Sequence, residues 1–329
     1  MWILCGVYIF IFAAVIKGQN ISNTTEIENE EPVEPTVSWF LFGIEVLEFV
    51  IGIVGNTLLL IICTRHKSMR GRSNAMIINL AVADTLGLCT NVPLLYILNK
   101  FGYTDFSCRA IIFLINLCVF LSMYTVVFLS YERFRAVTSS TNVQCNFNNH
   151  NRHSNVFKML CLWAMGCING IVSCIPSMNI DSQCVIIKSW EIYMLYKNGV
   201  LIVTAMVIVA LFSLRASVNL RRSVRNFPGE RAIHEERINN RVVASKTLIA
   251  LSILFVVTYS PAIVLSLVMN DNSHVFLDFS FTIRYVIDDL GKIMAILNAT
   301  CNPLVFCFLS SKFRKYFKSY IMCKYLELD

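Results

Sequence analysis

Seven long apolar stretches divide this chain, and they constrain its fold more than any other feature of the sequence. A helix that crosses a bilayer needs roughly 20 mostly apolar residues, and each stretch is about that long or longer. They lie near residues 39–64, 75–99, 108–135, 156–179, 192–216, 243–269 and 281–308. We therefore predict an all-α membrane protein, a bundle of seven transmembrane helices. A shorter amphipathic stretch over 311–323 predicts an eighth helix on the membrane surface.

The composition supports this interpretation and excludes several others. Of the 329 residues, 56% are apolar and 15% are charged, whereas soluble domains carry about 45–50% and about 25%. The chain has no room for a large soluble domain beside seven spans. Its 13 cysteines show no CxxC pair and no metal-ligand spacing, so no metal site is predicted. We find no nucleophile–base–orienter set either, so we do not expect an enzyme.

The basic residues predict the orientation in the membrane. They gather after the first, third, fifth and seventh apolar stretches, whereas the alternate loops hold only Lys100, Arg109, Lys188, Lys197 and Arg284, with acidic residues beside them. Cytoplasmic loops carry an excess of Lys and Arg. The amino terminus is therefore expected outside and the carboxyl terminus inside, in the plasma membrane. This placement explains the net charge of +7 without nucleic acid as a partner.

The chain before the first span divides into two predicted segments. Residues 1–18 are expected to be a signal peptide, with an uncleaved extra helix as the alternative. Residues 19–38 are expected to be an extracellular tail, glycosylated at the sequons of Asn20 and Asn23. Its five glutamates fit either a solvated, disordered linker or an attractor for a basic ligand. The seven-helix domain is then 39–310, and the amphipathic helix with its tail is 311–329.

Polar residues inside the apolar stretches are the first candidate site. An ionisable group in a span costs several kcal/mol unless it is paired or hydrated, so Asp84 is a functional candidate. Asn56, Asn79, Ser122, Asn298 and Asn302 could build a hydrated cluster with it. The alternative is ordinary hydrogen bonding between helices, worth about 0.6 kcal/mol for each bond.

Two further pairs lie at opposite ends of the third span. Glu132 and Arg133 close it on the cytoplasmic side, where a charge pair fits a two-state switch or an interfacial anchor. Cys108 opens the span outside, and Cys184 lies in the next outer loop. Both face an oxidising compartment, which permits a disulfide between them.

Taken in order, several motifs of this chain resemble the rhodopsin-like G-protein-coupled receptors, from about residue 40 to 323. The motifs are Gly55-Asn56, Leu80-Ala81-Val82-Ala83-Asp84, the pair Cys108 and Cys184, Glu132-Arg133-Phe134, Trp163, Phe255 with Pro261, and Asn302-Pro303-Leu304-Val305-Phe306. The resemblance implies a sodium site at Asp84, Ser122 and Asn298, and no other cofactor. It implies coupling to a heterotrimeric G protein through Arg133. It also implies switch roles for Phe255, Tyr259, Pro261, Asn302, Pro303 and Phe306.

Within that family, three stretches look most like the bombesin and endothelin peptide receptors and their invertebrate relatives. They are 132–137, 245–248 and 308–319. Amine receptors carry an Asp where this chain has Ile115 and Asn116, so a peptide ligand is expected. Lys292 lies where bombesin receptors carry a basic ligand-binding residue; the alternative is snorkelling toward the interface. The expected ligand contacts are Asn116, Tyr259, Arg284, Asp288, Asp289 and Lys292.

The chain also departs from the family pattern. Tyr259 replaces the usual Trp of the sixth helix, Phe306 replaces the usual Tyr of the seventh, and 192–216 contains no Pro. These changes leave a binding-only or decoy receptor as an alternative. A transporter is a remote alternative, because only Asp84 and Lys292 are charged at mid-membrane.

Cys323 is a palmitoylation candidate or a free thiol, and the basic inner segments are expected to bind anionic lipid.

Overall fold

A computed structural model of the chain describes residues 35–66, 74–138, 150–226, 246–247, 249–261 and 281–322. The predicted signal peptide, the sequons of Asn20 and Asn23, and Cys323 lie outside these residues.

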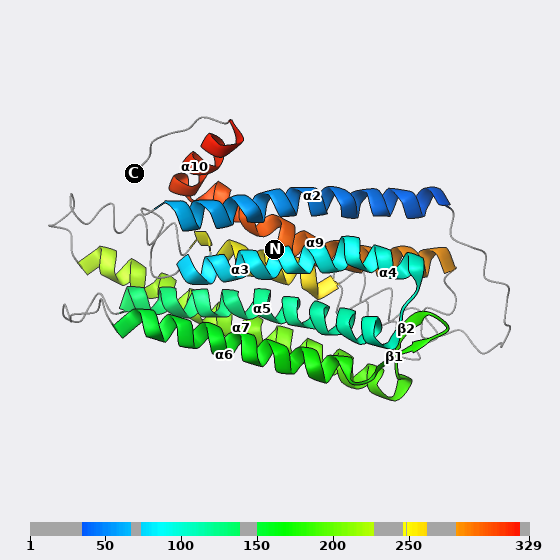
Figure 1. The fold of residues 1–329 in the computed structure, drawn as a ribbon. Helices are drawn as coiled ribbons and strands as arrows, with labels where there is room; N and C mark the ends of the chain where they lie inside the picture. The colour runs from blue at the N-terminus through cyan, green and yellow to red at the C-terminus, as the bar shows by residue number, and fades with distance from the viewer. Residues whose placement is uncertain are drawn as a thin grey trace, which may run out of the picture.

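All the helices described except the last, α10, run side by side along one long axis (Figure 1). The helices are α2 (Pro35–Arg65), α3 (Asn74–Cys89), α4 (Leu95–Phe101), α5 (Asp105–Thr138), α6 (His150–Cys174), α7 (Lys188–Asn226), α9 (Phe281–Leu309) and α10 (Ser311–Ile321). A single π-helical turn, η3 (Thr90–Leu94), joins α3 to α4 and contains Pro93, which has no amide hydrogen to donate. Six helical segments of the described chain are long and apolar enough to cross a membrane, and Ile249–Pro261 is a shorter apolar helix.

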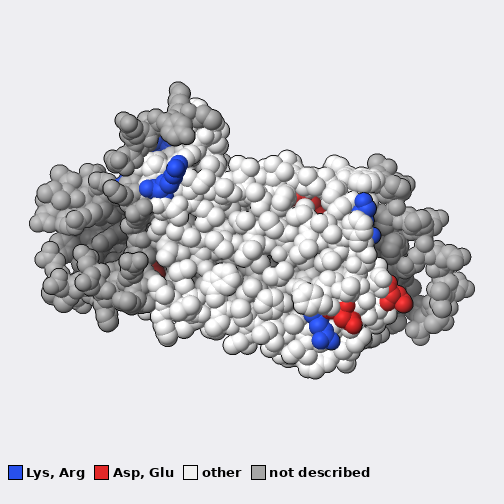
Figure 2. Space-filling view, viewed as in Figure 1, with Lys and Arg blue, Asp and Glu red and all other residues white. Residues whose placement is uncertain are grey.

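The surface of the bundle agrees with this arrangement. Figure 2 shows a broad uncharged belt around the middle of the visible face, with basic and acidic residues gathered toward the two ends. Large apolar side chains such as Val54, Ile168 and Val203 are each more than half exposed in the spans. Such side chains are stable in lipid, which hides the apolar area that a monomer in water would leave exposed.

A β-hairpin closes one end of the bundle, which we call the hairpin end. Strands β1 (Ser177–Ile180) and β2 (Gln183–Ile186) pair in antiparallel register. Asp181 and Ser182 form its turn with φ of 49° and 64°, the double positive φ that matches the twist of paired strands. The fourth helix was predicted to run to residue 179, which is wrong. It ends at Cys174 because Pro176 disfavours helical geometry before it.

Two ties hold the hairpin over the bundle. The predicted disulfide is confirmed: it joins Cys108 at the start of α5 to Cys184 in β2, with their Cα atoms 5.2 Å apart. The Tyr103 amide donates to the Ser182 carbonyl at 3.0 Å. The hairpin therefore forms a fixed cover at the mouth of the helices.

Close helix packing depends on small residues. A Cβ added to Gly170 of α6 would lie 2.6 Å from the ring of Phe113 on α5, and one added to Gly166 would lie 2.9 Å from Leu117. Glycines four residues apart let two helix backbones approach closely, as in other membrane bundles. These positions therefore fix how near α6 lies to α5.

At the opposite end, α10 packs against the carboxyl-terminal ends of α2 and α9 and projects away from the long axis of the bundle (Figure 1). Ser310 caps it by accepting from the Phe313 amide at 3.3 Å, the usual role of a serine at a helix start. Phe313 and Tyr316 are buried, and the His66 ring of the α2 end stacks on Tyr316 at 3.9 Å. This agrees with the predicted amphipathic eighth helix, and we call this the α10 end.

Candidate functional site: a buried polar network below two cavities

Asp84 is the centre of a buried network. Only 2% of the residue is exposed. Its carboxylate accepts from Ser122 Oγ at 2.8 Å and from Asn302 Nδ2 at 2.7 Å, so it joins α3, α5 and α9. A cavity of about 30 Å³ adjoins Asp84 and Ser122, and a water needs about 10–15 Å³ of such space. Carboxylate and hydroxyl oxygens beside a small cavity are suitable ligands for a hard cation such as Na⁺.

Asn298 does not donate to Asp84. Its Nδ2 donates to Thr258 Oγ1 at 3.0 Å and thereby links α9 to the segment 249–261. Asn56 links α9 to α2, because its Nδ2 donates to the carbonyl oxygens of Gly52 and Ala299 at 3.0 and 3.1 Å. Gly55 makes this approach possible, since a Cβ there would lie 3.0 Å from Pro303.

Asn79 ties three helices with one amide. Its Nδ2 donates to Thr125 Oγ1 on α5 at 2.7 Å, and its Oδ1 accepts from Trp163 Nε1 on α6 at 2.8 Å. Both polar atoms of the amide are therefore satisfied by neighbouring helices. A hydrocarbon surrounding supplies no other partners, so this contact fixes the register of α3 against α5 and α6.

Above the network lies a cavity of about 240 Å³, which we call the central cavity. Asn116 of α5, Asn169 of α6, Asn198 of α7, Tyr259 and Ala295 of α9 contribute to its otherwise largely apolar lining. Amides on apolar walls can orient a ligand by hydrogen bonds while the walls bury its apolar surface.

Tyr259 adjoins both the central cavity and the small cavity beside Asp84, as Val119 and Ala295 also do. The residue is 9% exposed, and its ring lies 4.6 Å from the ring of Phe255, one turn earlier in the same helix. Both rings pack into one apolar cluster with Met123 of α5 and Ile202 of α7. A displacement of Tyr259 would therefore disturb the packing of this segment on α5 and α7.

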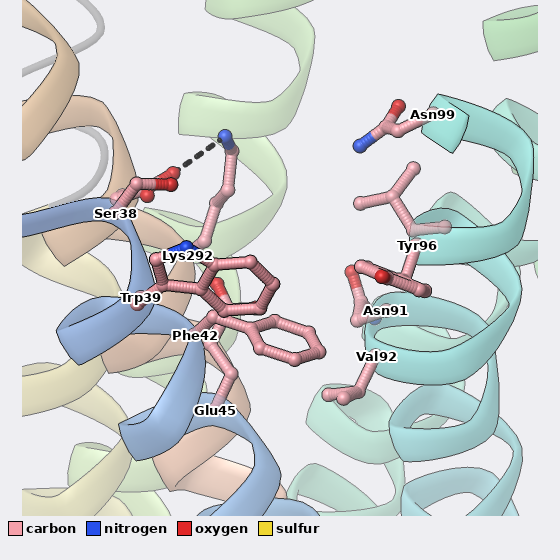
Figure 3. Close-up of a pocket in the computed structure, with 11 residues that line it drawn as sticks. Ser38, Trp39, Phe42, Glu45, Asn91, Val92, Tyr96, Asn99 and Lys292 are labelled. Atoms are coloured by element: carbon pink, nitrogen blue, oxygen red, sulfur yellow. Dashed lines mark hydrogen bonds and ion pairs between the residues drawn. The ribbon is translucent and has the colours of Figure 1, made fainter. Parts of the chain in front are cut away.

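A second cavity, of about 280 Å³, opens at the hairpin end between α2, η3, α4 and α9, and we call it the side cavity. The rings of Trp39 and Phe42 extend from α2 toward Asn91 and Tyr96 (Figure 3). Lys292 Nζ lies 3.0 Å from Asp289 Oδ1 at its edge.

The rim of the side cavity is held by Asn99. Its Oδ1 accepts a 2.6 Å hydrogen bond from the Tyr103 hydroxyl. Burial raises the pKa of Tyr103, so the hydroxyl stays protonated and remains the donor.

At the α10 end, the buried Glu132 forms an ion pair with Lys158 of α6. The Lys158 ammonium also lies 5.9 Å from the centre of the Tyr131 ring. Phe134 lies near Phe212 of α7, with their centroids 5.5 Å apart. Arg133 belongs to α5, but its side chain lies outside the part of the chain that is described, as do those of Arg284 and Asp288 on α9.

The structure thus divides the expected ligand contacts between two cavities. Asn116 and Tyr259 line the central cavity, and Asp289 and Lys292 line the side cavity. The α2 residues of the side cavity were missed from the sequence, because a Trp and a Phe at the start of an apolar stretch look like interfacial anchors.

Lys197 was also misjudged from the sequence. It was counted as a loop cation, yet it lies within α7 and donates to Ser173 of α6. Its place inside the fifth apolar stretch was the available signal.

Comparison with known proteins agrees with this architecture. The model of the rhodopsin family of seven-transmembrane receptors matches residues 55–306. The allatostatin-A receptor of Bombyx mori is 26% identical over 319 residues, which cover 92% of this chain and 85% of that receptor. The neuropeptide CCHamide-1 receptor of Drosophila melanogaster is 25% identical, with 84% and 59% covered. Bombesin receptor subtype-3 of Ovis aries is 26% identical, with 83% and 72% covered.

The chain belongs to the rhodopsin family of seven-transmembrane receptors. The predicted seven-helix fold class is thereby confirmed. The segment 249–261 then belongs to the sixth of the seven membrane helices, and the chain is a multi-pass membrane protein.

Proposed function

We propose that this chain is a cell-surface receptor that binds an extracellular peptide and activates a heterotrimeric G protein. Its relatives are named as receptors for allatostatin-A and CCHamide-1 and as a bombesin receptor. The hairpin end faces outside in this proposal, in the plasma membrane, and the α10 end faces the cytoplasm.

One observation carries the proposal: Tyr259 is a common wall of the central cavity and of the small cavity at Asp84. A ligand that fills the central cavity would contact the same ring that bounds the buried network. A peptide that fits one position of Tyr259 better than another shifts the equilibrium between those positions. Binding outside is thus coupled to helix packing inside.

The coupling then continues along the helices. Thr258, next to Tyr259, accepts from Asn298 of α9, and Asn302 one turn further donates to Asp84. Movement of the segment 249–261 would therefore act on α9 through Thr258 and on α5 through the Phe255 cluster. Arg133, Glu132 and the basic inner loops would meet the G protein at the α10 end.

Two further partners belong to this proposal. A sodium ion would be held by Asp84 and Ser122; Asn298, the third ligand expected from the resemblance, donates to Thr258 in this structure. Anionic lipid would bind the exposed basic side chains of α10, which are Lys312, Arg314, Lys315 and Lys318.

The test is nucleotide exchange on purified G proteins, with the receptor in lipid nanodiscs and a peptide library as the ligand source. A peptide that accelerates exchange through the wild-type chain, but not through Arg133→Ala, supports the proposal. Binding of the same peptide should survive in Arg133→Ala, since that residue lies at the other end of the bundle. Exchange that is unaffected by every peptide, on every G-protein class, contradicts it.

A second candidate, a binding-only receptor, is favoured by one observation. Phe306 is buried against Phe313 of α10, with ring centroids 6.3 Å apart. It offers no hydroxyl at a position where the family motif that this stretch resembles has Tyr. Phe306→Tyr in the exchange experiment separates the two candidates, because only a receptor that couples weakly should gain activity from the added hydroxyl.

A further inference from the structure

The side cavity has a chemistry that differs from that of the central cavity. Its first wall is aromatic: the Phe42 ring of α2 stacks on Tyr96 of α4, with centroids 4.9 Å apart and planes 27° apart. Trp39 meets Phe42 edge to face at 6.2 Å and is 67% exposed. Figure 3 shows these rings projecting into the space between α2 and α4. Part of the aromatic surface is therefore open to an incoming group.

The second wall carries charge. Glu45 of α2, Asp289 and Lys292 of α9 line the same cavity. Two carboxylates and one ammonium give a formal charge of −1 for these three side chains. Lys292 is already paired with Asp289 at 3.0 Å.

Glu45 is the carboxylate in excess. It is half-buried, and it makes no hydrogen bond or ion pair with any part of the chain that the structure describes. Lys292 acts on Glu45 only at longer range, and a carboxylate held partly out of water without a hydrogen-bonded cation is stabilised by an incoming one.

We propose that the side cavity binds an arginine side chain of the peptide ligand, with its guanidinium on the Phe42–Tyr96 aromatic surface and its fork on the Glu45 carboxylate. A planar guanidinium both stacks flat on aromatic faces and pairs two N–H groups with one carboxylate, whereas an ammonium is a point charge that can lie over a ring but lacks the planar fork. The inference rests on the proposed function, since it names the chemistry of one part of the ligand.

The cavity is large enough for one arginine side chain and lies at the lower limit of sites that bury a whole small molecule. Sites that bury a drug-sized molecule span about 300–1,000 Å³, and this cavity has about 280 Å³. The remainder of a peptide would occupy the mouth of the bundle and the central cavity. Glu45 would repel a ligand carboxylate more strongly than the neutral Asp289–Lys292 pair does. Removing each charge separately therefore tests which of them sets the preference for a cationic ligand group.

The experiment uses two probes with the full chain in nanodiscs and no G protein. They are Nα-acetyl-arginine N-methylamide and its citrulline analogue, which has nearly the same shape but no charge. Saturation-transfer NMR titrations give the affinity of each. A charge-assisted pair predicts about tenfold tighter binding of the arginine probe.

Three variants locate the effect. Glu45→Gln preserves shape and should reduce the arginine preference to about twofold or less. Lys292→Met should strengthen arginine binding, because it removes a like charge and releases Asp289. Glu48→Gln is the matched control: Glu48 lies one turn along α2, is buried and does not line the cavity, so its variant should keep the wild-type preference. Thermal unfolding confirms that each variant is folded.

Two results overturn the inference. The first is equal affinity of both probes for the wild-type chain. The second is an arginine preference that persists in Glu45→Gln but is lost in Lys292→Met. Failure of the proposed function has a different outcome. A chain that prefers arginine through Glu45 but never accelerates nucleotide exchange would refute signalling and leave the arginine site standing.

Discussion

Two carboxylates of the same bundle, those of Asp84 and Glu45, differ in burial and in hydrogen bonding. Asp84 is 2% exposed and accepts two hydrogen bonds of 2.7–2.8 Å from two other helices. Glu45 lines an open cavity and makes no hydrogen bond or ion pair in the described ranges. A buried charge with its partners in place holds helices together, whereas one without partners is available for a ligand. Asp84 thus belongs to the part of the bundle that stabilises the fold, and Glu45 belongs to the part that is proposed to bind the ligand.

The largest expected effect is that of removing the satisfied carboxylate. Asp84→Leu leaves Ser122 and Asn302 as buried donors without an acceptor, at about 1–3 kcal/mol of unfolding free energy for each. Thermal or denaturant unfolding of the purified chain measures the loss. Asp84→Asn retains one acceptor oxygen and should lose less. If Asp84→Leu were as stable as the wild type, the network would not be structural.

Next in size is the ion pair at the α10 end. Lys158→Met deprives the buried Glu132 of its cation, and we expect a loss of about 3 kcal/mol, since breaking a buried pair typically costs about 3–5 kcal/mol and the Lys158 side chain is still 17% exposed. The double variant Lys158→Met/Glu132→Gln should recover most of that loss. A double variant that is no more stable than the single one would show that packing of the Lys158 stem, and not charge, is responsible.

A smaller effect is expected where a neutral hydrogen bond joins helices. Trp163→Phe removes the indole donor to Asn79 Oδ1. Bonds of this kind in membrane bundles average about 0.6 kcal/mol and reach about 1.7 kcal/mol. Reversible unfolding in mixed micelles can resolve this difference. Thr125→Val tests the other half of the same amide, and strict additivity of the two variants would argue against a shared network.

The smallest effect on stability is expected at Glu45. Glu45→Leu removes a carboxylate that makes no hydrogen bond or close ion pair among the described residues, so the free energy of unfolding should change by no more than about 0.5 kcal/mol. The same variant should abolish the arginine preference of the side cavity. A large loss of stability would mean that Glu45 belongs to the fold, and the contrast with Asp84 would fail.

The sequence predicted the spans well because lipid leaves the backbone no alternative to helices. It predicted their ends poorly. α7 continues to Asn226, beyond the expected residue 216, because a helix can extend into water where hydropathy no longer marks it. The hairpin was missed for a related reason: the apolar stretch 156–179 includes Pro176, and hydropathy alone does not register that break.

Only the residues of the candidate site that belong to sequence motifs could be predicted. Asp84, Ser122 and Asn302 were expected to form one cluster, and the structure brings them within hydrogen-bonding distance. The pairing of Glu132 with Lys158 was not expected, since 26 residues separate them and no periodicity relates α5 to α6. The aromatic wall at Phe42 and Tyr96 likewise depends on how two helices pack, which sequence patterns within one helix do not encode.

The shared position of Tyr259 has a consequence for how two occupants would affect each other. The small space beside Asp84 holds about 30 Å³, which is room for one or two water molecules. A peptide group that drives the phenol ring inward must therefore expel a discrete molecule or ion. Thermodynamic linkage makes this antagonism mutual: whatever occupies the lower space weakens the upper occupant by the same factor. Replacing choline by sodium at fixed ionic strength would then weaken peptide affinity progressively, up to the limit set by full occupancy of the lower space.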